Sequence, residues 1–243
     1  REIYIMGLSH SPRIVTDGLI LCVDAGDKMS YPGAGTVWTD LSKQGNNGTL
    51  TNGPTFDSAN RGSIVFDGSN DRIETNYTEA LGTSDFSYEC WVRYTVANQI
   101  GNIISKRSNV AYEQASLFIS GRHDGGITGA KVCFYHRSGN VRSFASSLNY
   151  NDDKWHHIVL SSVHDGKTIL YIDNEEIASR DNALSTITET PPILIGCAAD
   201  GSSPYSGRIA HFNGKIAIAK VYTHALSAAE ITQNYNATRG RFQ

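Results

Sequence analysis

The sequence has little that would mark a nucleic-acid-binding protein or a membrane protein. Its 243 residues carry a formal net charge of -3, whereas nucleic-acid binders usually present a basic face or stripe. No apolar run approaches the roughly 20 residues that a membrane helix requires, and the first residues lack the charged-then-apolar pattern of a signal peptide. We therefore expect neither a nucleic-acid partner nor a membrane span.

Cysteine is also scarce. The four cysteines, Cys22, Cys90, Cys133 and Cys197, are far apart and form no C-x-x-C pair, which excludes a zinc knuckle and a dithiol redox motif. Each falls where a strand favours a small apolar residue, and unpaired cysteine is among the most buried residue types. We expect four buried free thiols, with disulfides as the alternative.

Segments that alternate between apolar and polar residues are abundant. The clearest is FSYECWVRY, in which a period of two places alternate side chains on opposite faces of a strand. One face is expected to join the core: Phe86, Tyr88, Cys90, Val92 and Tyr94. The other is expected to form the amphipathic outer side of a sheet: Ser87, Glu89, Trp91 and Arg93. GLILCVDAG, ASLFIS, KVCFYHR, VRSFASS, PILIG and GKIAIAKVYT are further strand candidates.

Turn residues separate these strands. KWHHIVLSSV and KTILYIDNEEIAS flank Asp165-Gly166, a pair expected to supply positive backbone angles in a hairpin turn. SIVFDG and DRIETN are expected to pair as a hairpin about Ser69 and Asn70. These features predict an all-β fold made of two antiparallel sheets.

A single helix is expected near the C-terminus. Ser227 and Glu230 form the S-x-x-E capping box, and Leu226 with Ile231 occupies the positions of a hydrophobic staple. The sequence therefore predicts a short helix that starts at Ser227, ends before Gly240 and packs against the sandwich.

The order and spacing of these segments resemble a known family. FDGSNDRIE, FSYECWVRY, the W-H-H hairpin and the A-L-S-x-x-E-I helix together resemble laminin G-like, concanavalin A-like jelly rolls. The resemblance implies a two-sheet antiparallel jelly-roll sandwich with one short C-terminal helix. We assign residues 16–243 to this domain and residues 1–15 to an N-terminal extension.

Three segments resemble a subgroup of that family found in bacteriophage virion proteins. These are the GLILCVDAG opening, the YPGAGTVWTDLS loop and the NNGTLTNGPTF stretch. The resemblance implies a capsid decoration or tail fibre head that packs on other virion structural proteins and contacts host surface glycans. It further implies a place on the virion surface, with a secreted or cell-surface protein as the alternative, and self-association in repeated copies.

Known catalytic strings do not occur in the sequence. Glucanases of the same fold carry an E-x-D-x-x-E strand for the two carboxylates that glycoside cleavage needs, yet Glu89 is alone on its strand. His156 and His157 are neighbours on a strand, so they point to opposite faces and do not readily hold one metal ion. We expect a non-enzymatic binding or adhesion module, and a divergent glycoside hydrolase is the least favoured alternative.

Relatives in the superfamily often hold calcium, which requires six to eight oxygen ligands. Two clusters of oxygen-bearing side chains are candidates: Asp24 with Asp27, and Asp67 with Asn70 and Asp71. Such clusters are also ordinary turn material. Ala217 and Ala219 stand where many relatives carry an acidic residue, so we expect no required cofactor and treat a structural calcium ion as an alternative.

A carbohydrate-binding lectin domain is the main alternative to a purely structural virion component. Such a site would join an aromatic platform to amides and carboxylates. Five aromatic residues in expected loops are candidates: Tyr31, Trp38, Tyr112, Tyr150 and Tyr205. Each is also a candidate to cover a sheet edge, and the sequence does not choose between the two roles.

Overall fold

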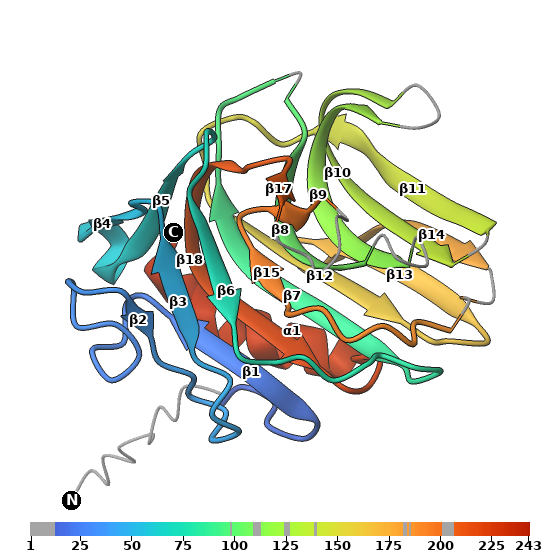
Figure 1. Cartoon of the computed structure of the whole chain (residues 1–243), viewed down its shortest axis with the longest axis horizontal. Coiled ribbons are helices and arrows are strands. Elements are labelled where there is room, and N and C mark those ends of the chain that lie inside the picture. Colours follow the sequence, from blue (N-terminus) through green and yellow to red (C-terminus); the bar gives the residue numbers. More distant parts are fainter. Residues whose placement is uncertain are drawn as a thin grey trace, which may run out of the picture.

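The fold is a sandwich of two antiparallel eight-stranded sheets (Figure 1). A computed structural model of the chain describes residues 13–97, 99–108, 113–123, 127–138, 140–181, 184, 186–200 and 207–243. The prediction of an antiparallel jelly-roll sandwich with one short helix is confirmed.

Sheet A has the strand order β14–β13–β12–β7–β18–β5–β4, and β1 also pairs with β18. Its strands are β1 (Leu19–Asp24), β4 (Thr55–Asp57), β5 (Ser63–Asp67), β7 (Phe86–Arg93), β12 (His156–Ser162), β13 (Lys167–Ile172), β14 (Glu175–Asp181) and β18 (Asn213–Tyr222). Short 3-10 turns lie at η1 (Ala59–Arg61) and η2 (Arg239–Arg241).

Sheet B has the order β11–β10–β9–β8–β15–β6–β3–β2. Its strands are β2 (Val37–Trp38), β3 (Gly48–Thr51), β6 (Arg72–Thr75), β8 (Gly101–Arg107), β9 (Gln114–His123), β10 (Ile127–Ser138), β11 (Asn140–Asn149) and β15 (Leu194–Ile195). A separate two-stranded hairpin is formed by β16 (Ala198–Ala199) and β17 (Arg208–Ile209).

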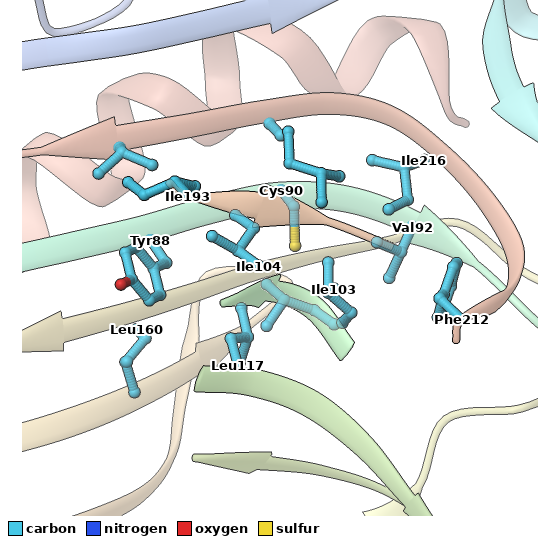
Figure 2. Close-up of a cluster of buried hydrophobic side chains, with 14 of the residues drawn as sticks. Tyr88, Cys90, Val92, Ile103, Ile104, Leu117, Leu160, Ile193, Phe212 and Ile216 are labelled. Atoms are coloured by element: carbon cyan, nitrogen blue, oxygen red, sulfur yellow. The ribbon is translucent and has the colours of Figure 1, made fainter. Parts of the chain in front are cut away.

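The hydrophobic core fills the space between the two sheets. Figure 2 shows Tyr88, Cys90 and Val92 of sheet A beside Ile104 and Leu117 of sheet B. The expected inner face of β7 is confirmed, because its alternate residues all belong to this core cluster. The four cysteines are buried free thiols, as predicted.

Two details of the predicted hairpins are wrong. β5 and β6 belong to different sheets, so the turn at residues 67–71 connects the layers and does not close a hairpin. β12 and β13 do pair, but neither Asp165 nor Gly166 has a positive φ. The positive angles occur one turn later, at Asp173 and Asn174 between β13 and β14, because those two residues alone must reverse the chain.

Helix α1 (Ala228–Thr238) begins as predicted, with a complete capping box between Ser227 and Glu230. It lies behind sheet A in Figure 1 and covers the outer side of β7 and β18. Leu226 and Ile231 are buried in one cluster with Tyr222. None of the helices in the described ranges is long and apolar enough to cross a membrane.

The helix corrects the expectation for the outer face of β7. Ser87, Glu89 and Trp91 were expected on an amphipathic outer side, yet all three are buried beneath the C-terminal segment. Trp91 stacks on Phe242 with ring centroids 4.2 Å apart and donates from Nε1 to Thr238 Oγ1. Only Arg93 stays partly exposed, where it pairs with Asp153.

The domain boundary at residue 16 stays a prediction. Residues 1–12 lie outside the described residues. Just before the proposed boundary, the backbone N–H of Val15 donates to Asn234 Oδ1 at 2.7 Å. The Gln233 side chain of α1 also donates to the Arg13 carbonyl at 2.7 Å, so the chain already contacts α1 before residue 16.

Candidate functional site

The hairpin β16–β17 and the segment that follows it lie against the outer face of sheet B. The Ser105 hydroxyl donates to the Cys197 carbonyl at 2.8 Å, and the Asn102 backbone N–H donates to the Ala210 carbonyl at 2.9 Å. Two bonds from β8 therefore hold this covering segment at its two ends.

Strand register decides which side chains face the covering segment. Asn102 of β8 pairs with Phe118 of β9, and Arg107 pairs with Gln114. Gln114 and Phe118 are four positions apart on β9, so their side chains lie on the same face of the strand. Leu117, on the opposite face, belongs to the core cluster, whereas Phe118 does not. All four paired side chains are therefore on the outer side of the sheet.

These side chains line an open cavity, which we call the front cavity. Its volume is about 70 Å³, and its lining consists of Ile100, Asn102, Arg107, Gln114, Phe118 and the Ile209-Ala210 segment. Apolar groups form one part of the wall, and the amides and the guanidinium form the rest. Such a mixture of apolar surface with a few polar groups is typical of small-ligand sites.

Asn102 is the unusual member of this cavity. It is only 3% exposed, and its buried Oδ1 has no hydrogen-bond partner among the described residues. A buried polar atom without a partner costs about 1–3 kcal/mol, and native structures contain few of them. The register shift between Asn102 and Ile104 on β8 sets the direction of this side chain, because a bulge redirects the residues beside it.

The other two polar residues of the cavity are Gln114, whose amide has a hydrogen-bond partner, and the partly buried Arg107. Gln114 Nε2 donates to Ser116 Oγ at 2.8 Å, which fixes the orientation of the Gln114 amide. Burial lowers the pKa of Arg107 from its ordinary value, yet a guanidinium remains a cation at neutral pH. The cavity thus combines a fixed amide, a cation and an unsatisfied amide oxygen.

The backbone opposite Asn102 is strained. Ala210 has a φ of 53°, a left-handed conformation that costs a non-glycine residue of the order of 1–3 kcal/mol. Its carbonyl accepts the bond from Asn102 N. Strain of this kind is concentrated at binding and switch sites, and here it lies at the cavity wall.

A second and larger hollow lies beside the C-terminal end of α1. Its volume is about 300 Å³, and Arg61, Asn236 and Thr238 are among its lining residues. Arg241, also in the lining, forms an ion pair with Asp24 and donates from Nη2 to the Gly62 carbonyl at 2.8 Å. None of the described residues that line this hollow is aromatic, so they offer no stacking surface.

Two of the predicted sugar-binding aromatics lie inside the fold. Trp38 is completely buried, and Tyr31 is 4% exposed. The Tyr31 hydroxyl donates to the Gly35 carbonyl, and its ring packs against Phe56 with centroids 5.5 Å apart. Both rings belong to the core cluster, so neither offers an open face for stacking as it stands, and sugar binding by them stays a prediction.

Of the other three aromatics, Tyr150 lies among the described residues. Tyr150 is half-buried and makes an edge contact with His156, with ring centroids 5.1 Å apart. Tyr112 and Tyr205 lie outside the described residues. In the chain, Tyr112 belongs to the connection between β8 and β9, and Tyr205 to the connection between β16 and β17.

The predicted calcium ligands occupy two turns. Asp24 Oδ1 accepts from the Gly26 N–H and is paired with Arg241, and Asp27 Oδ1 accepts from the Met29 N–H. In this cluster the side chains stabilise the turn, and the arginine neutralises Asp24.

In the second cluster, Asp71 Oδ2 accepts from the Asp67 N–H at 3.0 Å, and Asp67 Oδ1 accepts from the Ser69 N–H. The Asn70 carbonyl accepts from the Asn52 side chain. Burial raises the pKa of Asp71. Across the ranges that the structure describes, no three His, Cys, Asp or Glu residues group to hold a metal ion, and calcium binding by these turns stays a prediction.

The sequence analysis missed Asn102, Arg107, Gln114 and Phe118. A signal was present in β9, where Gln114, Ser116, Phe118 and Ser120 alternate with the apolar Ala115, Leu117 and Ile119. A polar face that carries one aromatic ring indicates an exposed or ligand-facing side of a strand. The sequence gives no local signal that Ala210 lies against Asn102, because 108 positions separate the two residues.

Comparison with models of known protein families shows to which superfamily the chain belongs. A family model described as the concanavalin A-like lectin/glucanases superfamily matches residues 67–232, well over half of the chain. The chain belongs to this superfamily. The matched range contains the residues of the front cavity and ends within helix α1, and the resemblance inferred from the sequence is confirmed.

Solved structures with the same fold include several binding domains. The binding domain of Paraclostridial Mosquitocidal Protein 1 matches with a TM-score of 0.68 and 17% identity, covering 91% of this chain and 52% of that chain. A botulinum neurotoxin serotype D/C binding domain matches with a TM-score of 0.68 and 16% identity, covering 92% and 53%. The superfamily member described here thus spans about half the length of these domains.

A third neighbour is comparable in length. Domain 4 of AbnA, an extracellular arabinanase from Geobacillus stearothermophilus, was solved in complex with arabinotriose. It matches with a TM-score of 0.65 and 15% identity, covering 89% of this chain and 98% of that chain. A comparison with curated protein sequences found no match. At these identities the structural matches establish the fold alone.

Proposed function

We propose that this chain is a non-enzymatic carbohydrate-binding module whose ligand lies on the outer face of sheet B. The observation that carries the proposal is the buried Asn102 amide, whose Oδ1 finds no partner in the part of the chain that the structure describes and which lines an open cavity beside Phe118. A ligand rich in hydroxyl groups supplies the missing donor, and the ring supplies apolar contact.

The neighbours support this proposal by analogy of fold. One is a domain of a polysaccharide-degrading enzyme in complex with a trisaccharide, and another is a toxin binding domain in complex with SialylT. Glu89, the carboxylate of β7, is fully buried and paired with Lys220, so it is not placed to act on a ligand. We therefore propose binding without cleavage.

A glycan array tests the binding module. We expect the wild-type protein to give signals that are lost on Phe118→Ala and retained on Leu148→Ala, a change on the exposed β11. An array on which the folded wild-type protein binds no glycan would contradict the proposal. Release of reducing sugar from a polysaccharide panel would contradict the absence of catalysis.

We further propose that the module is a bacteriophage virion component, either a capsid decoration or a tail fibre head, that packs on other virion structural proteins in repeated copies. The support is the sequence resemblance of the GLILCVDAG opening and the loops that follow it. Negative-stain microscopy of purified particles with an antibody against the chain tests this setting. Unlabelled particles would favour a secreted or cell-surface protein instead.

A further inference from the structure

The chemistry of the front cavity narrows the ligand to one class of substituent. The cavity of about 70 Å³ is roughly half as large as a cavity of about 150 Å³ that holds one benzene molecule. That is space for a substituent of a few heavy atoms and not for a complete pyranose ring. The ring of a bound sugar must therefore lie outside the cavity and insert one of its substituents.

The residues that line the cavity set three chemical requirements for that substituent. The described residues supply no donor to Asn102 Oδ1, so the substituent must carry an N–H or an O–H. Ile100, Phe118 and Ile209 line the same space, so it must also carry an apolar group. Arg107 and Gln114 offer guanidinium and amide donors in the lining, so an acceptor oxygen completes the match.

Common sugar substituents meet these requirements to different degrees. A carboxylate, sulfate or phosphate suits Arg107 but brings only acceptors to the Asn102 oxygen. A hydroxyl has a donor and an acceptor but no methyl group to fill the apolar part. An acetamido group has an N–H, a carbonyl oxygen and a methyl group in one plane.

We propose that the front cavity binds the acetamido group of an N-acetylated hexosamine. This inference rests on the proposed carbohydrate-binding function and adds the class of sugar that is bound. The acetamido N–H donates to Asn102, the carbonyl oxygen accepts from the Arg107 and Gln114 side of the cavity, and the methyl group contacts Phe118. Asn102 and Phe118 are in this account the specificity-determining residues.

Matched sugars test the inference on the intact chain. The probes are N-acetylglucosamine and N-acetylgalactosamine, each compared with its counterpart that has a hydroxyl in place of the acetamido group, glucose or galactose. Two-dimensional NMR of the labelled protein follows the side-chain amide signals, and the Asn102 signal is identified by its loss in Asn102→Asp. We expect at least one N-acetylated sugar to shift the Asn102 signal and to bind about tenfold more tightly than its counterpart, because an analogue that lacks a required hydrogen-bonding group leaves a buried polar atom unpaired.

Two variants give independent readouts. Asn102→Ala is expected to remove the preference for N-acetylated sugars, and Leu148→Ala, on the exposed part of β11, is expected to leave it unchanged. If Asn102→Ala does not fold, Gln114→Ala, which changes the same wall, is expected to reduce the preference, and the sugar comparison on the wild-type protein still stands.

The outcomes separate this inference from the function on which it rests. Equal binding of the N-acetylated sugars and their hydroxyl counterparts at the Asn102 signal would overturn the acetamido inference and keep the binding module. Glycan binding that leaves the Asn102 signal unmoved would overturn the site. No binding of any probe, together with an empty glycan array, would overturn both.

Discussion

The two sheets carry polar residues on their outer faces but satisfy them differently. Over sheet A, helix α1 covers a fully buried Glu89, and three groups donate to or contact its carboxylate. Over sheet B, the short hairpin β16–β17 and the segment after it cover Asn102, whose side-chain oxygen has no partner within the described ranges. A polar group under a complete cover contributes to stability, whereas one beside an open cavity is available to a ligand.

Both carboxylate oxygens of Glu89 have partners. Lys220 Nζ lies 2.6 Å and His157 Nε2 3.0 Å from Glu89 Oε1, and Asn234 Nδ2 donates to Oε2 at 2.6 Å. Burial raises the pKa of Glu89, but Lys220 and His157 outweigh it and lower the pKa to about 2. Glu89 is therefore a carboxylate at neutral pH, and its charge depends on these partners.

The largest expected effect follows from breaking this cluster. Lys220→Met removes the cation and leaves the buried Glu89 carboxylate without its charged partner; breaking a buried ion pair in this way typically costs about 3–5 kcal/mol. We expect the free energy of unfolding, measured with urea, to fall by that amount, and the double variant Glu89→Gln with Lys220→Met to recover a large part of it. Lys154→Met, at an exposed pair with Asp152, is expected to change it by less than about 0.5 kcal/mol. A small effect of Lys220→Met would mean that α1 does not seal this face.

The clearest comparison of the two outer faces uses Asn234, on the helix that covers sheet A, and Asn102, on sheet B. Asn234→Ala removes a donor to Glu89 and to Tyr222 and an acceptor for the Val15 N–H, and we expect a loss of about 2–3 kcal/mol. Asn102→Ala removes an amide whose oxygen has no partner, so the same urea measurement is expected to show a change of about 1 kcal/mol or less in either direction. Equal losses in the two variants would contradict the difference between the faces.

A smaller effect is expected at the start of α1. The Ser227 hydroxyl accepts from the Glu230 N–H, and the Glu230 carboxylate accepts from the Ser227 N–H. Ser227→Ala removes half of this capping box, for which about 1 kcal/mol is typical. Thermal unfolding followed by circular dichroism measures it, and Ser227→Asn, another good N-cap residue, is expected to retain the stability.

The smallest effect is a dependence on pH at the rim of sheet A. Burial lowers the pKa of His156, but Asp173 Oδ2 at 2.7 Å and Asp152 Oδ1 at 2.9 Å outweigh it and raise the pKa above 6.5. Because the folded state binds the proton more tightly, this contribution to stability is complete below the unfolded pKa and is lost as pH rises through the folded pKa. We expect the difference in unfolding free energy between wild type and His156→Gln to shrink from about pH 6 to about pH 9. A difference that grows with pH would contradict the raised pKa of His156.

Much of the fold was predictable from the sequence because it is encoded locally. Alternation placed Tyr88, Cys90 and Val92 in the core, and the capping box located the start of α1. The burial and the pairing of Glu89 were not predictable in the same way. Its partners Lys220 and Asn234 lie 131 and 145 positions away, and alternation alone does not reveal that a helix covers the outer face.

The candidate site was less predictable than the fold. Trp38 and Tyr31 were chosen because they occur in loop-like sequence, yet Trp38 lies on strand β2 and both rings belong to the core. Phe118 was overlooked because ASLFIS reads as a buried strand. Whether a polar atom lacks a partner depends on every segment packed around it, and for Asn102 this includes the distant Ala210.

The packing of the C-terminal end has a practical consequence. Phe242 is stacked on Trp91 on the outer side of sheet A, next to η2, while the front cavity opens on sheet B. A biotin tag or surface tether added after Gln243 would therefore leave from the back of the sandwich. A protein immobilised in this way presents its cavity to the solution, so a sensor or array experiment reads the face under test without steric interference from the support.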